Sequence, residues 1–406
     1  MSSGSKSGVL YISYDGMLEP LGQSQVITYL ERLTQEADIH ILSFEKPADF
    51  AQDDKVQALR ARLDAAGIRW HPLTYHKTPT LPATLFDITQ GTLMALWLTL
   101  RHRVALVHAR SYVPALIGWV VKLLTGAALL FDMRGFWADE RTDGGIWPAG
   151  GRTYRTVKRL ERTLLCGADH VVTLTHASKA VIEDFPYLKG RPHAPVSVIP
   201  TCADLDRFTP GENAGGKPDK AGPFTLGYLG SIGTWYMFDE VLGLFALLRE
   251  RLPDARLLVV NRNEQDLVRR LAADAGIPAA ALEITSADHA EVPAAVRRMS
   301  AGAAIIRPVY SKIASAPTKL AEYLGCGVPC LGNIGVGDME TILEGEGAGV
   351  ALRAFTPEER VRAVDRLIAM AANPATAGHC RAVALRHFSA EQGAAKYRAI
   401  YQSLLS

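Results

Sequence analysis

The chain has 406 residues, of which 48% are hydrophobic and 21% are charged. This composition can supply the cores of two or three globular domains. The formal net charge of +2 is too small to indicate nucleic-acid binding. Five scattered cysteines lack metal-site spacing, so we expect reduced thiols. The polar N-terminal segment MSSGSKSG lacks the apolar stretch of a secretory signal, and we therefore expect a cytoplasmic protein.

One apolar segment, residues 93–100 (LMALWLTL), is followed at once by Arg-His-Arg. It has about half the length that a transmembrane helix needs. We expect a buried helical turn here, and the alternative is peripheral contact with the inner face of a membrane. A later helix pattern, residues 152–163, carries basic residues along one face. Such a face is usually solvated, but it also suits an acidic lipid or an acidic acceptor.

Short apolar runs alternate with helix-like segments along the chain, which is typical of parallel, doubly wound α/β sheets. In the first half, the predicted strands are residues 9–14, 39–44, 105–109, 128–133 and 170–175. In the second half, they are residues 224–230, 255–261, 282–285, 302–308, 327–333 and 347–352. Two Rossmann-like domains in tandem are therefore the predicted fold.

The segment between the two halves is rich in glycine, proline and charge, which predicts a linker. The predicted divisions are an N-terminal domain (9–208), the linker (209–223), a C-terminal domain (224–386) and a final helix (387–406).

Ligands of open α/β sheets bind beyond the carboxyl ends of the strands, so polar residues that follow strands are the site candidates. After the first strand, Gly22 and Gln23 lie in a long loop that leads into a helix, whose N–H groups can hold an anion. A structural turn is the alternative. At the end of the 105–109 strand, Arg110 can bind a carboxylate or phosphate. A lone histidine such as His108 is more often structural than catalytic.

The loop at residues 131–147 combines six charged side chains with the aromatic residues Phe136, Trp137 and Trp147. We interpret it as an acceptor pocket, in which an aromatic face such as that of Trp137 stacks on a sugar or a lipid-linked headgroup. Charges such as Asp132 and Arg134 would orient hydroxyl groups. The alternative is a surface loop held together by its aromatic residues.

Two segments of the second half predict a phosphate site. Gly230, Ser231 and Gly233 follow its first strand, where glycine lets the backbone approach a phosphate closely. Residues 315–327 predict a short loop and a helix, with Pro317 in the first turn.

The helix start at residues 315–327 carries groups for both parts of a nucleotide. Ser315, Thr318 and Lys319 are candidates for a diphosphate. Glu322 shares a helix face with Thr318 and Lys319, and its carboxylate can accept hydrogen bonds from the two hydroxyls of a ribose. The alternative is an ordinary ion pair between Lys319 and Glu322 on the helix surface.

Several motifs, taken together and in this order, resemble the family 4 retaining glycosyltransferases. The resemblance extends from about residue 9 to about residue 400, and its motifs are YDGMLEPLGQSQ, DMRGFW, VVTLTHASK, VIPTCADLDRF, YLGSIG, SAPTKLAEYLGCGVP and NIGVGD.

The resemblance implies the GT-B fold, with a donor site mainly in the C-terminal domain, an acceptor site in the N-terminal domain and a final helix that crosses back. It implies transfer of a sugar from a nucleotide donor with retention at the anomeric carbon. Glu322 matches the second Glu of the family's Glu-x7-Glu motif, which binds the ribose. Ala314 stands in place of the first Glu.

A second departure concerns the diphosphate. Many family members carry an arginine and a lysine near the YLGSIG strand, and this chain has neither. The cations that remain for this role are Arg262, Arg307, Lys312 and Lys319.

The expected reaction moves a hexose-type sugar, with a UDP-sugar favoured as donor, to a glycan, lipid-linked or small-molecule acceptor in polysaccharide or related biosynthesis. No carboxylate is placed by motif as a covalent nucleophile, so we expect front-face substitution. We assign catalysis to Asp132, Arg134, Lys319 and Arg307. We expect no cofactor and no metal, because we see no Asp-x-Asp metal motif in a strand-end loop.

Two other functions stay open. One is a nucleotide-sugar epimerase of GT-B type, against which the acceptor-like loop and the crossover helix argue. The other is a degenerate sugar-nucleotide-binding protein, suggested by the missing glutamate and the missing cation pair.

Overall fold

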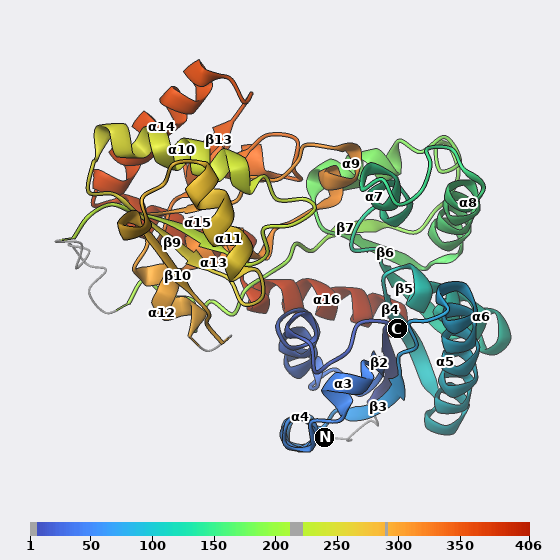
Figure 1. Cartoon of the computed structure of the whole chain (residues 1–406). Coiled ribbons are helices and arrows are strands. Elements are labelled where there is room, and N and C mark those ends of the chain that lie inside the picture. Colours follow the sequence, from blue (N-terminus) through green and yellow to red (C-terminus); the bar gives the residue numbers. More distant parts are fainter. Residues whose placement is uncertain (1–5, 212–221, 289–290) are drawn as a thin grey trace. The chain divides into compact units, whose positions relative to one another are not determined.

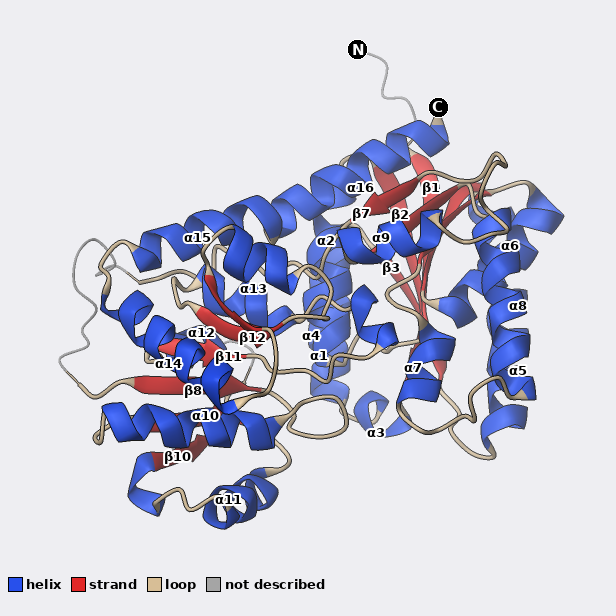
Figure 2. Cartoon of the chain, turned by 90° about the horizontal axis from the view of Figure 1, so that it is seen from above, coloured by secondary structure: helices blue, strands red, loops and turns tan. Residues whose placement is uncertain are grey.

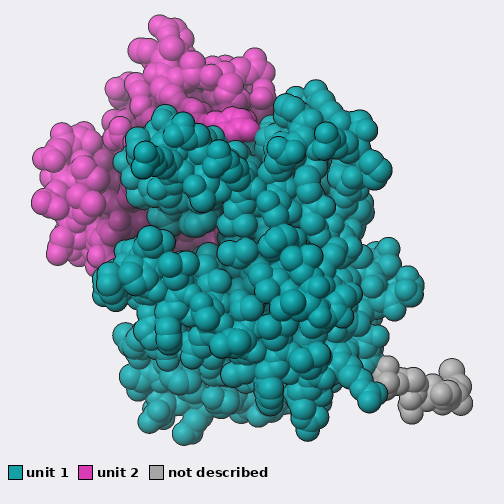
Figure 3. Space-filling model, turned by 90° about the vertical axis from the view of Figure 1, so that its right-hand side faces the viewer, with its two compact units in different colours: residues 1–200, 390–406 teal, residues 201–389 magenta. Residues whose placement is uncertain are grey.

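A computed structural model describes residues 6–211, 222–288 and 291–406. The chain folds into two compact units (Figure 3). Unit 1 consists of Met1–Pro200 and Ala390–Ser406, and unit 2 is Thr201–Ser389. Each unit is a parallel sheet with helices on both faces (Figure 1; Figure 2), as expected for two Rossmann-like domains.

The sheet of unit 1 has the order β3-β2-β1-β4-β5-β6-β7 over the described residues. Its strands are β1 (Ser7–Ser13), β2 (Ala37–Glu45), β3 (Arg69–Thr74), β4 (Val104–Arg110), β5 (Ala128–Asp132), β6 (His170–Thr173) and β7 (Val196–Val198). Its helices are α1 (Pro20–Gly22), α2 (Thr28–Leu30), α3 (Pro47–Phe50), α4 (Asp53–Ala65), α5 (Thr80–His102), α6 (Tyr112–Thr125), α7 (Trp137–Asp143), α8 (Arg152–Gly167), α9 (His176–Glu183) and α16 (Ala390–Leu405). A π turn (Gln23–Ile27) and a 3-10 turn (Glu31–Leu33) join α1 and α2 into one irregular helical segment.

The sheet of unit 2 has the order β10-β9-β8-β11-β12-β13 over the described residues. Its strands are β8 (Thr225–Leu229), β9 (Arg256–Val260), β10 (Leu282–Thr285), β11 (Ala301–Ala303), β12 (Cys330–Asn333) and β13 (Gly349–Leu352). Its helices are α10 (Phe238–Arg251), α11 (Gln265–Asp274), α12 (Val292–Arg297), α13 (Thr318–Gly325), α14 (Pro357–Ala372) and α15 (Thr376–His387). Shorter 3-10 or π turns lie at Ala279–Ala281, Tyr310–Ala314 and Thr341–Gly345.

All eleven predicted strands are present, although β11 ends at Ala303 rather than at residue 308. Two strands of unit 1, β3 and β7, were not predicted. Both lie at the edges of the sheet. An edge strand tolerates Pro72 in β3 and the short length of β7, so neither has the continuous apolar run of a central strand.

The two units meet in the chain near residue 200, eight residues before the predicted end of the first domain. Leu205 and Phe208 are buried in the core of unit 2, and Arg381 of α15 donates to both of their carbonyl groups. Most of the predicted linker (212–221) lies outside the described residues. At the other end of the chain, α16 packs on unit 1, where Tyr397 and Tyr401 are buried.

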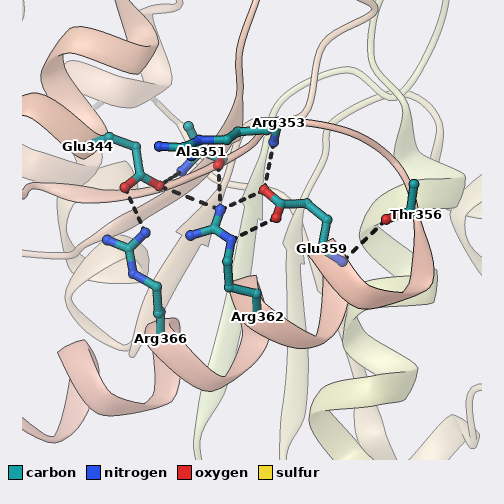
Figure 4. Close-up of polar contacts among 7 residues, drawn as sticks. All are labelled: Glu344, Ala351, Arg353, Thr356, Glu359, Arg362 and Arg366. Atoms are coloured by element: carbon teal, nitrogen blue, oxygen red, sulfur yellow. Dashed lines mark hydrogen bonds and ion pairs between the residues drawn. The ribbon is translucent and has the colours of Figure 1, made fainter.

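Unit 2 contains a network of paired charges that ties β13 to α14 (Figure 4). Glu344 accepts from the Ala351 amide and from Arg366. Arg362 pairs with both Glu344 and Glu359. Each charge in this network faces an opposite one, which is the pattern of a structural cluster.

No helix in the described part of the chain is both long enough and apolar enough to cross a membrane. The expected buried turn at residues 93–100 is wrong for its largest side chains. Leu93, Trp97 and Leu100 project from α5 with 65%, 55% and 72% of their surface exposed. Within this run, α5 buries Ala95, Leu98 and Thr99 and turns these three large apolar side chains outward.

Candidate functional site

The loop after β8 is held in shape by hydrogen bonds to its backbone. The Tyr228 hydroxyl donates to the carbonyl of Ser231 over 2.6 Å. Asn261 Nδ2, beyond the neighbouring strand β9, donates to the carbonyl of Gly230, and Glu264 accepts from the Ile232 amide. Gly230 has a φ of +88°, which a residue with a side chain rarely adopts. These contacts fix the loop backbone, and the glycine allows a ligand beyond the strand end to approach that backbone closely.

The next residues of this loop run beside the segment that follows β11. The Met237 amide donates to Ile305, and the Arg307 amide donates to the carbonyl of Trp235. Tyr236 forms a bridge with Ile306 between them. This pairing places the rings of Trp235 and Tyr236 next to the segment that leads into α13.

Lys319, in the first turn of α13, lies against two aromatic rings. Its Nζ atom is 4.3 Å from the ring centre of Tyr228 and 3.8 Å from that of Tyr236. A Cβ atom at Gly230 would lie 3.9 Å from this Nζ. Lys319 is only 7% exposed, and its Nζ has no hydrogen-bond partner among the described residues. A buried ammonium group without a partner is costly, so its retention points to an anion that this site binds.

Glu322 follows one turn later on the same helix and is half-buried. The surface ion pair that was the alternative interpretation is not formed, because Lys319 Nζ has no partner among the residues that the structure describes. Burial between the tyrosine rings lowers the pKa of Lys319 to about 7, with Glu322 acting against it. Burial also raises the pKa of Glu322 to about 7, with Lys319 acting against it. The folded protein thus disfavours the charged form of each group, and a ligand that interacts with the charged forms would favour them again.

Other predicted donor residues surround this pair to different degrees. Lys312 Nζ lies 3.9 Å from the ring centre of Trp235. Ser315, Pro317 and Thr318 form the half-buried entry to α13, where no side chain caps the helix start. Ala314 is buried, so the position of the missing glutamate is filled by packing.

Two predicted cations have no contact with Lys319 or Glu322. Arg262 points to solvent and pairs with Asp288, which is also exposed. Arg307 is exposed as well, although its backbone belongs to the pairing with Trp235. Lys319 and Lys312 are therefore the cations that the structure brings to the β8 loop.

A second polar cluster lies in unit 1, where β4 and β5 end. Asp132 is buried, and its Oδ2 is 3.7 Å from Arg134 and 3.8 Å from His108. Tyr397 of α16 donates to the same oxygen over 3.1 Å, and the Tyr401 hydroxyl lies 2.8 Å from His108 Nδ1.

The charged groups of this second cluster shift one another's pKa values. Burial alone would raise the pKa of Asp132, but Arg134, together with His108 and Arg110, lowers it to about 2. Burial lowers the pKa of His108, which keeps the imidazole neutral. The cluster thus places two guanidinium groups, those of Arg134 and Arg110, near one carboxylate. Asp132 Oδ1, Arg134 Nη1 and Arg110 Nη1 have no hydrogen-bond partner among the described residues. Arg134 has a φ of +60°, an uncommon conformation for a residue with a side chain.

The remaining unit 1 candidates make contacts within unit 1. Arg110 is buried, and its Nε lies 3.6 Å from Asp15. Gln23 donates to the carbonyl of Met17. A Cβ atom at Gly22 would clash with the backbone of Gly16.

Trp137 opens α7 and is half-buried. Its ring centre lies 5.6 Å from those of Tyr112 and of Trp147. The three rings form one aromatic cluster, so the alternative of a loop held by its aromatic residues is present in the structure.

Several residues of both clusters were not predicted. The loop sequence YLGSIGTWY did contain the signal for the Lys319 cage, because its tyrosines and tryptophan directly follow a strand. Tyr397 and Tyr401 are spaced four apart and so share a helix face, which was a usable signal for α16. Asn261 and Glu264 had no signal in the sequence.

The arrangement of possible metal-ligating side chains is the next feature of the molecule. No group of three or more His, Cys, Asp or Glu residues in the described part of the chain is arranged to hold a metal ion. One Asp-x-Asp sequence does occur after β7, contrary to the expectation, at Asp204-Leu205-Asp206. Asp204 Oδ1 accepts from the Asp206 amide, which makes this pair part of a turn.

Two family models match successive parts of the sequence. The one described as "Glycosyl transferase 4-like domain" matches residues 24–202, and the one described as "Glycosyl transferases group 1" matches residues 212–378. No curated protein gave a significant match.

Solved structures show the fold at low sequence identity. Sucrose-phosphate synthase from Thermosynechococcus elongatus matches with a TM-score of 0.75 at 14% identity, covering 98% of this chain and 99% of the other. Anabaena HepE in complex with UDP and glucose matches with a TM-score of 0.69 at 15% identity, covering 98% and 100%. A Listeria monocytogenes protein provisionally assigned as a UDP-N-acetylglucosamine 2-epimerase matches with a TM-score of 0.61 at 14% identity, covering 98% and 96%.

Proposed function

The chain is a glycosyltransferase of the GT-B fold, and we propose that it transfers a hexose-type sugar from a nucleoside-diphosphate donor, with a UDP-sugar favoured. The acceptor is a hydroxyl of a glycan, a lipid-linked saccharide or a small molecule. The single observation that carries the donor proposal is the unpartnered, buried Lys319 beside Gly230. The UDP complexes of HepE support the choice of base.

The donor diphosphate would bind between Lys319 and the backbone of the β8 loop. A phosphate oxygen near Nζ would return the ammonium group to its fully charged form, because the attraction offsets the effect of burial on its pKa. Ser315 and Thr318 would add hydroxyl donors at the helix start. Lys312, over the ring of Trp235, would provide a second cation.

Glu322 would bind the ribose. Its carboxylate has no hydrogen-bond partner among the described residues, and two vicinal hydroxyls would satisfy both oxygens. Because burial holds the pKa of this carboxyl near 7, hydrogen bonds to the ionised form would also lower it toward its ordinary value.

The proposed reaction is front-face substitution with retention. The acceptor hydroxyl oxygen bonds to the anomeric carbon on the side from which the diphosphate leaves. The bond between that carbon and the phosphate oxygen breaks, and the acceptor proton passes to the departing phosphate. Lys319 and Lys312 would stabilise the growing negative charge, which is usually the largest contribution to the rate. The exposed Arg307 would contribute only if its side chain turned toward the diphosphate. Asp132 and Arg134 would act on the acceptor side.

We propose that the reaction needs neither a metal ion nor a cofactor. The support is the ammonium group of Lys319, which can neutralise charge on the leaving phosphate. The Asp204–Asp206 turn is committed to its own backbone hydrogen bond. Full turnover after treatment with a chelator would support this, and restoration by added Mg²⁺ or Mn²⁺ would contradict it.

We place the activity in polysaccharide or related biosynthesis in the cytoplasm, with peripheral contact at the inner face of a membrane. The five cysteines are free thiols and four of them are buried, which suits a reducing compartment.

A panel of UDP-, GDP-, ADP- and TDP-sugars in a thermal-shift assay tests the donor proposal, since a ligand of the folded state raises its stability. Glu322→Ala should weaken binding of the best donor by about 1.5–3 kcal/mol, the value of a hydrogen bond to a charged group. Glu359→Ala, in the paired network of Figure 4, is the matched control and should leave binding unchanged. Equal affinity in all three proteins by calorimetry would overturn the ribose assignment.

The fate of the donor sugar distinguishes the proposed transferase from an epimerase and from a degenerate binding protein. The Listeria neighbour, provisionally assigned as an epimerase, is the reason to include that alternative in the test. Transfer or slow hydrolysis of the sugar supports the proposed function, isomerisation of the donor supports an epimerase, and binding without turnover supports a degenerate binding protein.

A further inference from the structure

The outward face of helix α5 in unit 1 is apolar. The residues that face the sheet recur every three or four positions and include Ala83, Asp87, Gly91, Ala95 and Leu98. The large apolar residues that point away are between 55% and 72% exposed and comprise Leu81, Leu85, Phe86, Leu93, Trp97 and Leu100. An ordinary surface helix places charged residues on this side. Here the only charged side chain of α5 before its last turn is the buried Asp87.

The neighbouring helix α6 continues the same surface. Leu123 and Leu124, in its last turn, are 62% and 67% exposed. The two helices pack closely, because a Cβ atom at Gly91 of α5 would lie 2.9 Å from Ile117 of α6. Figures 1 and 2 show α5, α6 and α8 side by side on one face of the sheet.

The direction of these helices brings their exposed ends together. α5 ends two residues before β4, and α6 ends three residues before the adjacent strand β5. The strands are parallel, so both helix ends lie at the amino-terminal edge of the sheet. Leu100 and Leu124 therefore belong to one end of the same layer.

This concentration of apolar side chains is local. Twelve large hydrophobic side chains are exposed among the described residues, and eight of them are on α5 and α6. A contiguous exposed apolar surface of this kind marks an interaction site in a folded protein.

Basic side chains border the apolar surface. Arg101 and Arg103 follow the exposed Leu100. On the adjacent helix α8, four exposed arginines recur at helical spacing, namely Arg152, Arg155, Arg159 and Arg162. The two acidic residues of α5, α6 and α8, Asp87 and Glu161, are both buried. The charged side chains that these three helices expose are thus all basic, in a protein whose net charge is only +2.

We propose that the outer faces of α5, α6 and α8 form a docking surface for an anionic lipid bilayer. Leucine, phenylalanine and tryptophan side chains would enter the boundary between headgroups and acyl chains, where an amphipathic helix lies in the plane of the membrane. The arginines would face the negative headgroups, each adding attraction that salt weakens. This proposal does not depend on the sugar that the enzyme transfers.

Vesicle sedimentation with the full chain tests the proposal. Vesicles of phosphatidylcholine with phosphatidylglycerol should bind the protein, vesicles of phosphatidylcholine alone should bind it less, and high salt should reduce the difference. Leu93→Glu should weaken binding by about tenfold, because it removes apolar contact and adds a repelled charge. Leu385→Glu on α15 is the matched control, since Leu385 is also an exposed leucine, and should bind as the unaltered protein does.

The basic border has its own matched pair. Arg155→Glu with Arg159→Glu should abolish the preference for anionic vesicles. Arg256→Glu with Arg270→Glu, which changes two exposed arginines of unit 2, should preserve it. All these side chains are exposed, so thermal melting by circular dichroism should be unchanged in each variant and will verify folding.

Tryptophan fluorescence locates the contact. A blue shift on adding anionic vesicles should disappear in Trp97→Phe while sedimentation persists. The proposal is overturned if both leucine variants bind alike, or if neither kind of vesicle binds the unaltered chain. It is also overturned if ultracentrifugation shows a dimer that Leu93→Glu dissociates without any vesicle binding, because the occupant is then a second copy.

Discussion

Both units place buried charges beyond the carboxyl ends of their strands, but they balance those charges differently. In unit 1, Asp132 has Arg134 and His108 within 4 Å and receives a hydrogen bond from Tyr397. In unit 2, Lys319 lies against two tyrosine rings without a hydrogen bond to any described residue, and Glu322 does not pair with it.

The difference appears in the direction of the pKa shifts. The pKa of Asp132 is lowered to about 2, which means that the folded state favours the charged form. The pKa of Lys319 is lowered and that of Glu322 is raised, so the folded state disfavours both charged forms. A group that favours its charge when folded adds to stability, whereas a group that disfavours it reduces stability and gains from a ligand. In unit 1, neighbouring cations keep Asp132 in its charged form, whereas in unit 2 burial outweighs the attraction between Lys319 and Glu322.

The largest expected effect is on the unit 1 cluster. Asp132→Asn should destabilise the protein by about 3–5 kcal/mol, because it leaves the buried Arg134 without a countercharge. Denaturant unfolding at neutral pH measures this. Asp38→Asn, at a partly exposed pair with Arg69, is the matched control and should cost at most about 1 kcal/mol.

The pH dependence of the same variant has a definite sign. The folded pKa of Asp132 is below its unfolded value, so the stabilisation is complete above about pH 4 and is lost as the pH falls toward 2. The difference in the free energy of unfolding between the unaltered protein and Asp132→Asn should therefore become smaller as the pH falls from about 4 to about 2. An equal gap throughout would mean that Asp132 acts by packing rather than by charge, and the contrast between the units would fail.

The opposite sign is expected in unit 2. Lys319→Met combined with Glu322→Gln should stabilise the protein by about 1–4 kcal/mol at neutral pH, since it removes two poorly compensated charges. The same double variant should lose donor binding. The control is Arg362→Met with Glu359→Gln in the paired network of Figure 4, which should give no gain in stability. A destabilised Lys319–Glu322 variant would show that the pair is structural.

The rate of sugar transfer gives a further test of the role proposed for the charged groups of unit 2. Lys319→Ala should reduce transfer at saturating donor by at least about tenfold, equivalent to about 1.4 kcal/mol of transition-state stabilisation. Arg262→Ala should have little effect, because Arg262 is exposed and pairs with Asp288. The reverse result would assign the leaving diphosphate to Arg262 instead.

The polar cluster of unit 2 could be predicted from the sequence more completely than that of unit 1, for a physical reason. Lys319 and Glu322 lie on one helix turn after a strand, so local spacing alone brings them together. The Asp132 cluster is completed by Tyr397, 265 residues later in the chain, and spacing cannot reveal such a contact. The aromatic cage of Lys319 also required a loop that runs beside the segment that follows β11.

The apolar face of α5 was missed for a different reason. A run such as residues 93–100 predicts burial, because apolar side chains usually face a core. The fold buries only one side of α5, which includes Ala95 and Leu98, and Gly91 on that side allows a close approach to Phe44 of β2 and to Ile117 of α6.

The smallest predicted effect is on the pH dependence of donor binding. Diphosphate binding favours the charged form of Lys319, and ribose binding favours the ionised form of Glu322. Because burial brings both pKa values to about 7, donor affinity should be highest near neutrality and should fall on either side by up to about tenfold per pH unit. Calorimetry across this range should show Lys319→Met losing the alkaline decline and Glu322→Gln losing the acid decline. If both variants kept the full pH dependence of donor affinity, the titrating groups would lie on the donor or elsewhere in the chain. The proposed difference between the charged groups of the two units would then be wrong.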